Sequence, residues 1–189
     1  AALEHDSTFA LAALRLSKLG RYDDVGGQDA ADQATRLAWK YRDRLDESDQ
    51  VWLSTVVGPQ YPRWFWWRDR VNTLRAKLLD VPHSTEMWED LGDLLFHAGL
   101  QMGMSDSFGE AKSALARAFT YDSVLSEPRY HLFQIAAFEN DTSELNRLAD
   151  IWIRKQPNHR ATDYVRWQVA VTRGESRTLQ SLRQTFPTM

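Results

Sequence analysis

The chain has 189 residues, of which 43% are hydrophobic, and a formal net charge of −3. This composition supports a globular core and excludes wholesale disorder. The weak negative charge disfavours a general nucleic-acid-binding protein, which would carry a strongly basic face. The absence of cysteine excludes disulfides, thiolate metal sites and a cysteine nucleophile.

Helical periodicity dominates the first third of the chain, and strand signals are nearly absent. Polar capping residues at 6–8 precede an apolar stripe that ends at Gly20, and a second helix is predicted over residues 29–45. Residues 47–49 cap a short helix that carries apolar residues as far as Val56. Pro59 and Pro62 then interrupt the pattern, because proline lacks the backbone N–H and clashes within a helix interior.

The rest of the chain predicts seven further helices joined by short turns. The first covers residues 63–79. The others begin after Ser84, at Ser105, near Glu127, at Thr142, at about Ala161 and at Ser176. We therefore expect an all-α fold of about ten helices, packed as antiparallel pairs. No run approaches the roughly 20 apolar residues of a membrane span, so we expect no membrane insertion.

A repeated spacing of large and small residues runs through these helices. The clearest copy consists of Trp88, Leu91, Gly92 and Leu95 on its first helix and Ala111, Leu115 and Ala118 on its second. This is the spacing of a tetratricopeptide repeat, in which the small residues let the two helices approach closely. Looser copies cover residues 6–41, 127–157 and 162–186, whereas residues 46–80 fit poorly.

On these residues the chain resembles tetratricopeptide-repeat proteins over most of its length. Three segments make it resemble, more narrowly, the repeat regions of large bacterial signalling proteins such as serine/threonine kinases and transcriptional activators: Asp6–Ala12, Arg42–Leu45 with Gly58–Pro62, and Glu86–Asp93. The resemblance implies an α-solenoid of antiparallel helix pairs with a right-handed superhelical twist, whose concave face binds a protein or peptide. Enlarged loops and missing turn glycines are departures from the family pattern.

We expect residues 1–189 to form a single repeat domain. The chain starts at Ala1 without an initiator methionine or a signal-peptide core, so we expect it to be a segment of a longer protein. The resemblance favours a cytoplasmic location. The alternative is an extracytoplasmic domain of a membrane-anchored signalling protein, because repeat regions of kinase-linked relatives occur on either side of the membrane.

A polar stripe lies on one face of the helix that follows Ser84. It consists of Glu86, Glu89, Asp93 and His97, whose spacings of three or four residues match a helical turn. A metal site or an acid–base site is one interpretation, since carboxylates and imidazoles serve both purposes. The repeat register instead places the stripe, together with Phe96, on the concave face. We therefore expect it to bind a basic peptide, without metal, cofactor or catalysis.

Four consecutive aromatic residues, Trp64 to Trp67, precede a basic stretch that begins at Arg68. Successive helical positions differ by about 100°, so these side chains would spread over roughly 300° and cannot all face one core. We expect most of the tryptophans to pack between helices, and we assign Trp64, Trp67 and Arg68 to the partner surface. The alternatives are stacking on nucleobases or sugars, and weak homodimerisation through an exposed patch.

The remaining histidines, His5, His83, His131 and His159, have no metal-ligand spacing, and we expect them to be surface or capping residues. No Gly-x-Ser-x-Gly or phosphate-binding loop is present, so we expect no enzymatic activity. The sequence thus indicates a protein-interaction scaffold or a regulatory module of a bacterial signalling protein. The alternative is a module that senses a small molecule or glycan in an aromatic-rich groove.

Overall fold

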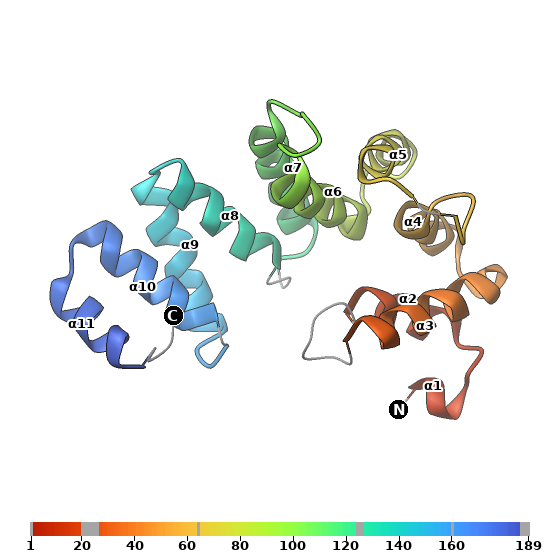
Figure 1. Cartoon of the computed structure of the whole chain (residues 1–189), viewed down its shortest axis with the longest axis horizontal. Helices are drawn as coiled ribbons and strands as arrows, with labels where there is room; N and C mark the ends of the chain where they lie inside the picture. The colour runs from red at the N-terminus through yellow and green to blue at the C-terminus, as the bar shows by residue number, and fades with distance from the viewer. Residues whose placement is uncertain (1, 20–26, 64, 124–126, 160, 186–189) are drawn as a thin grey trace. The chain divides into compact units, whose positions relative to one another are not determined.

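The computed structural model describes residues 2–19, 27–63, 65–123, 127–159 and 161–185, and every regular element in this part of the chain is a helix (Figure 1). The all-α prediction is therefore confirmed. The chain divides into two compact units, Ala1–Met87 and Trp88–Met189. The expectation of one continuous repeat domain stays a prediction. Within the described residues, no helix has both the length and the apolar character that crossing a bilayer requires.

The N-terminal unit consists of short helices that contact their neighbours in sequence. They are α1 (Ala2–His5), α2 (Ala10–Leu19), α3 (Gly27–Lys40), the 3-10 helix η2 (Arg42–Arg44), α4 (Glu47–Val57), α5 (Trp67–Asp80) and the first residues of α6 (Thr85–Ala98). Helix α2 packs on α3, and α4 contacts both α3 and α5. The buried faces of α2 and α3 are rich in alanine, with Ala10, Ala13, Ala31, Ala34 and Ala38 all buried. Such small side chains allow two helices to approach closely.

The predicted helix over residues 29–45 is divided in the structure into α3 and η2. At the end of α3, the guanidinium of Arg42 donates a hydrogen bond to the carbonyl oxygen of Trp39 at 2.9 Å. Asp46, rather than residues 47–49, caps α4: its side chain accepts a hydrogen bond from the backbone N–H of Asp49 at 2.7 Å. Capping of this kind satisfies a backbone donor that has no partner within the helix.

The helix predicted to start at residue 63 begins only at Trp67. Trp66 has an extended backbone, with φ −64° and ψ 143°, so Phe65 and Trp66 precede the helix and Trp67 is its first residue. Gly58 ends α4 with φ 81°, and a Cβ at this position would lie 2.7 Å from Cγ of Phe65. The packing of Phe65 on Gly58 thus accounts for the non-helical segment that the sequence pattern did not predict.

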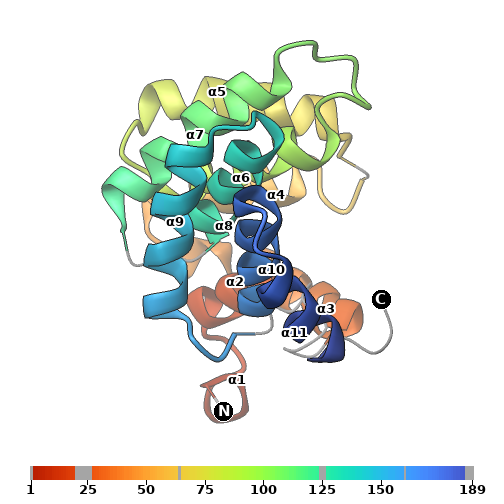
Figure 2. The same ribbon diagram turned by 90° about the vertical axis from the view of Figure 1, so that its left-hand side faces the viewer.

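The C-terminal unit continues from Trp88 along α6 and contains α7 (Ser107–Tyr121), α8 (Glu127–Phe138), α9 (Thr142–Lys155), α10 (Ala161–Arg173) and α11 (Ser176–Thr185). From α7 to α11 each helix contacts the next, and Figure 2 shows α9 lying beside α8 and α10. A buried hydrophobic cluster lies among α8, α9 and α10 and includes Phe133, Leu148, Trp152 and Val165.

Helices α6 and α7 approach closely at Gly92. A Cβ added to Gly92 would lie 2.5 Å from Cγ of Leu115 on α7. Leu91, Leu95 and Leu115 are all buried around this contact. Only a residue without a side chain fits here, because a protein interior has no spare volume for an additional methyl group.

Candidate functional site

The residues that the sequence assigned to a partner surface are divided between the two units. Glu86, Trp67 and Arg68 belong to the N-terminal unit, Glu89, Asp93, Phe96 and His97 belong to the C-terminal unit, and Trp64 lies outside the described residues.

The predicted acidic stripe on α6 is not uniform in its environment. Glu86 already forms an ion pair with Arg15, whose Nη1 lies 2.7 Å from the Glu86 Oε1 atom. Glu89 lies in the interior, with 7% of its surface exposed, and so does the neighbouring Asp90. Farther along the helix, Asp93 and His97 are accessible to solvent. The part of the stripe that remains open is therefore its C-terminal end.

Asp93 and His97 meet a third ionisable side chain, His131, which comes from α8. Asp93 Oδ1 lies 3.1 Å from His131 Nε2 and 3.4 Å from His97 Nε2. Asp93 and His97 are one turn apart on α6, so the helix itself brings them together. One ligand-type atom from each of the three residues lies within 4.8 Å of the others.

His131 is the most buried member of this cluster, with 6% of its surface exposed. Its Nδ1 atom lies 3.0 Å from the amide oxygen of Gln134, three residues along the same helix. His97 lies on the outer side, with 58% of its side chain exposed. Burial raises the pKa of Asp93, but the hydrogen bonds and charges from His131 and His97 outweigh this effect and hold the pKa below its ordinary value.

Aromatic rings pack against the cluster. The ring of Phe96 lies 4.9 Å from that of His97 and 4.9 Å from that of His131, centroid to centroid. Phe108, from α7, contacts Phe96 edge to face at 5.7 Å. Phe96, predicted to contact a partner, is thus half-buried and packs against both imidazoles. An apolar surround of this kind strengthens the interactions of the polar groups inside it.

The prediction that His131 is a surface or capping residue is wrong. The histidine is buried and contacts α6 through Asp93. The spacing of Asp93 and His97, which matches a helical turn, indicated these two residues from the sequence. No sequence pattern indicated His131, because only the packing of α8 relative to α6 brings that residue into the cluster.

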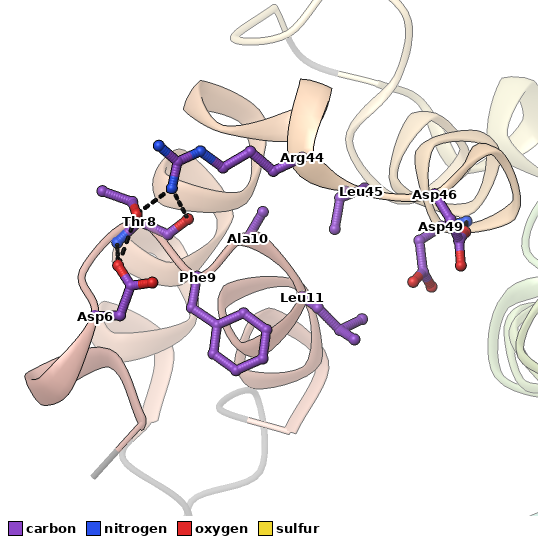
Figure 3. Close-up of a pocket in the computed structure, with 9 residues that line it drawn as sticks. All are labelled: Asp6, Thr8, Phe9, Ala10, Leu11, Arg44, Leu45, Asp46 and Asp49. Carbon is purple, nitrogen blue, oxygen red and sulfur yellow. Dashed lines mark hydrogen bonds between the residues drawn. The ribbon is translucent and has the colours of Figure 1, made fainter.

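A second site is a pocket in the N-terminal unit, formed where α2, η2 and the start of α4 converge (Figure 3). Its volume is about 420 Å³, within the range of roughly 300–1,000 Å³ that is usual for ligand pockets. It is lined by Asp6, Thr8, Phe9, Ala10, Leu11, Arg44, Leu45, Asp46 and Asp49. None of these residues was singled out from the sequence as part of a site.

The polar groups of the pocket differ in how well they are compensated. Thr8 donates hydrogen bonds from its hydroxyl and its amide to Asp6, which lowers the pKa of Asp6, and the hydroxyl also contacts Arg44. The pKa of Asp49 is shifted in the opposite direction. Burial and the nearby charge of Asp46 raise the pKa of Asp49, although Arg15 Nη2 lies 3.5 Å from its Oδ1 atom.

The described tryptophans differ in their exposure: Trp39 and Trp88 are half-buried, and Trp167 is 37% exposed. Trp52 and Trp152 are fully buried, and Trp152 donates a hydrogen bond from Nε1 to the hydroxyl of Thr162 at 3.0 Å. Trp66 and Trp67, at the start of α5, are 68% and 48% exposed. The prediction that tryptophans pack between helices is therefore confirmed for Trp52 and Trp152 but not for this exposed pair.

Comparisons with known proteins give no assignment. A scan against protein-family models and a search of curated proteins each find no match to this chain.

Proposed function

We propose that the chain is a non-catalytic protein-interaction module with a tetratricopeptide-like architecture, acting as a scaffold or regulatory segment of a bacterial signalling protein. Its partner is a peptide segment with an apolar side chain next to a lysine or arginine. The segment binds in the pocket between α2, η2 and α4. The observation that carries the proposal is this pocket, which combines exposed apolar residues with an excess of carboxylates.

The apolar part of the pocket supports the binding of a side chain from a partner. Phe9 and Leu11 are 46% and 37% exposed, although both are large hydrophobic residues. Figure 3 shows both side chains near the start of α2, where Phe9 precedes the helix and Leu11 lies in its first turn. Covering exposed aromatic and aliphatic surface supplies much of the free energy of protein association.

The charged part of the pocket supports a cationic neighbour to that apolar side chain. The lining contains three carboxylates, of Asp6, Asp46 and Asp49, and one guanidinium, of Arg44. The raised pKa of Asp49 means that its ionised form is incompletely compensated. An ammonium or guanidinium group from a partner would supply the missing compensation, and it would favour basic segments over acidic ones.

The helix pairs support the repeat part of the proposal. The repeat pattern assigns a small residue to Gly92 on α6 and a large one to Leu115 on α7, and a Cβ at Gly92 would lie 2.5 Å from Cγ of Leu115. In contrast, Phe9 is the one aromatic residue among the described residues that line the pocket. This lining is not the aromatic-rich groove on which the glycan alternative depends, and it favours a peptide.

A random-peptide display selection against the immobilised chain tests the proposal. Enriched peptides should contain lysine or arginine beside leucine or phenylalanine. A fluorescently labelled copy of one such peptide should bind the Phe9→Ala and Asp49→Asn variants about tenfold more weakly, which corresponds to roughly 1.4 kcal/mol of binding free energy. Fluorescence anisotropy measures the dissociation constants, and circular dichroism verifies that the variants fold.

Asp163→Asn provides the matched control. Asp163 is a carboxylate in the C-terminal unit, half-exposed and paired with Arg166 at 3.1 Å. Its substitution should leave peptide binding unchanged. Equal binding of the peptide by the wild type, Phe9→Ala and Asp49→Asn would exclude the pocket as the binding surface.

A further inference from the structure

The cluster of Asp93, His97 and His131 carries an inference that is independent of the proposed function, because it lies in the other unit. We propose that these three side chains bind a divalent transition-metal ion of the Zn²⁺ class. The ligand atoms would be Oδ1 of Asp93, Nε2 of His97 and Nε2 of His131. Two imidazoles and one carboxylate from a protein are a ligand set that suits Zn²⁺ and related ions such as Fe²⁺.

The separations between the ligand atoms fit such an ion. Zinc binds imidazole nitrogen and carboxylate oxygen at about 2.0–2.2 Å, so two ligand atoms at a tetrahedral angle lie roughly 3.3–3.5 Å apart. Asp93 Oδ1 lies 3.1 Å from one Nε2 atom and 3.4 Å from the other. The three ligand atoms, one from each residue, all lie within 4.8 Å of one another. His97 is exposed, so its side chain can move to bring its Nε2 atom closer to that of His131.

The hydrogen bond to Gln134 orients His131 for metal binding. A neutral His131 ring that donates its Nδ1 proton to the Gln134 Oε1 atom has a bare lone pair at Nε2. Without a metal, a protonated Nε2 donates a hydrogen bond to Asp93 Oδ1, 3.1 Å away, and a metal ion that binds here replaces this proton. A metal ion at this point satisfies both atoms. Gln134 is thus a positioning residue of the kind that usually fixes the tautomer of a metal-bound histidine.

The site joins two helices that are not consecutive in the chain. Asp93 and His97 lie on α6, His131 lies on α8, and α7 is the helix between them in sequence. A bound ion would therefore cross-link α6 to α8 and stabilise the folded C-terminal unit. Three protein ligands leave a coordination position on the side of the exposed His97, and water would occupy it.

A competition titration tests the site directly. The untagged chain, stripped of metal with a chelator, is titrated with Zn²⁺ in the presence of a chromogenic chelator. We expect one ion per chain, and we expect Co²⁺ to give visible absorption bands when it binds in place of Zn²⁺. The variants His97→Ala and Asp93→Asn should lower the Zn²⁺ affinity by at least about tenfold, since loss of an outer-sphere partner alone costs 10–100-fold. His97 and Asp93 are both accessible, so these variants are expected to fold.

The control is His5→Ala, which removes an exposed histidine from α1 in the other unit and should leave the affinity unchanged. Zn²⁺ should also raise the melting temperature of the wild type but not that of His97→Ala. Millimolar Mg²⁺, which prefers oxygen ligands, should not compete. The proposal is overturned if no ion binds, or if the wild type, His97→Ala and Asp93→Asn bind Zn²⁺ equally well, because the cluster is then an ion-pair network alone.

Discussion

Arg129 has a charged side chain in a buried environment. It is 1% exposed, and only its Nη2 atom has a described hydrogen bond, to the carbonyl oxygen of Ser123 at 2.7 Å. Within the described part of the chain, its Nε and Nη1 atoms have no hydrogen-bond partner. Burial lowers the pKa of its guanidinium, although the group lies over the Phe119 ring at 5.2 Å. A buried charge with so few partners costs free energy.

The first prediction concerns this cost. Arg129→Met retains the apolar stem and removes the charge, so it should leave the free energy of unfolding unchanged or raise it, by as much as ~1–2 kcal/mol. Arg129→Lys keeps the charge but loses the planar group over Phe119 and the Nη2 hydrogen bond, so it should be less stable than the wild type. Urea unfolding followed by circular dichroism measures both. A methionine variant that is more than about 1 kcal/mol less stable would show that the guanidinium stabilises the fold.

At the scale of helices, local sequence signals predicted where a helix begins when a polar capping residue directly precedes an apolar stripe. The helices that begin at Thr85, Thr142, Ala161 and Ser176 start within a residue of the predicted positions. The prediction of a helix failed at residues 63, 65 and 66, because the contact between Phe65 and Gly58 is made across a turn and periodicity carries no information about it. For the same reason the sequence indicated Asp93 and His97 but not His131, the member of their cluster that lies on α8.

The close approach of α6 and α7 leads to a second prediction. Gly92→Ala should lower the free energy of unfolding by about 1–3 kcal/mol, because the new methyl group would overlap the fully buried Leu115. This loss should appear although alanine forms helices better than glycine by about 1 kcal/mol.

Gly109→Ala is the matched control for that prediction. The three atoms nearest to a Cβ at Gly109, near the start of α7, all belong to the exposed side chain of Asp106, which can rotate away. This substitution should therefore be neutral or stabilising. If both alanine variants have the same stability, the α6–α7 contact does not require glycine.

At the scale of the molecule, the described helices mainly contact their neighbours in the chain, and the burial is uneven along it. The cluster among α8, α9 and α10 buries two large aromatic side chains, Phe133 and Trp152. In contrast, α1 buries no residue, and the described side chains of α11 are exposed or half-buried. When contacts are mainly between neighbours, stability varies along the chain and its poorly packed ends open most easily.

Amide hydrogen exchange should reveal this gradient in the intact chain. We expect the slowest exchange in α8 and α9, where opening a helix exposes the Phe133–Trp152 cluster to water, and the fastest in α1 and α11. Mass spectrometry of peptic fragments gives the exchange rate of each helix. Substituting Trp152 with Phe, which loses the Nε1 hydrogen bond to Thr162, should speed exchange in α9 and α10 while leaving α2 and α3 unchanged, because those helices belong to the other compact unit. Equal acceleration in all helices would instead mean that the whole chain opens in a single cooperative step.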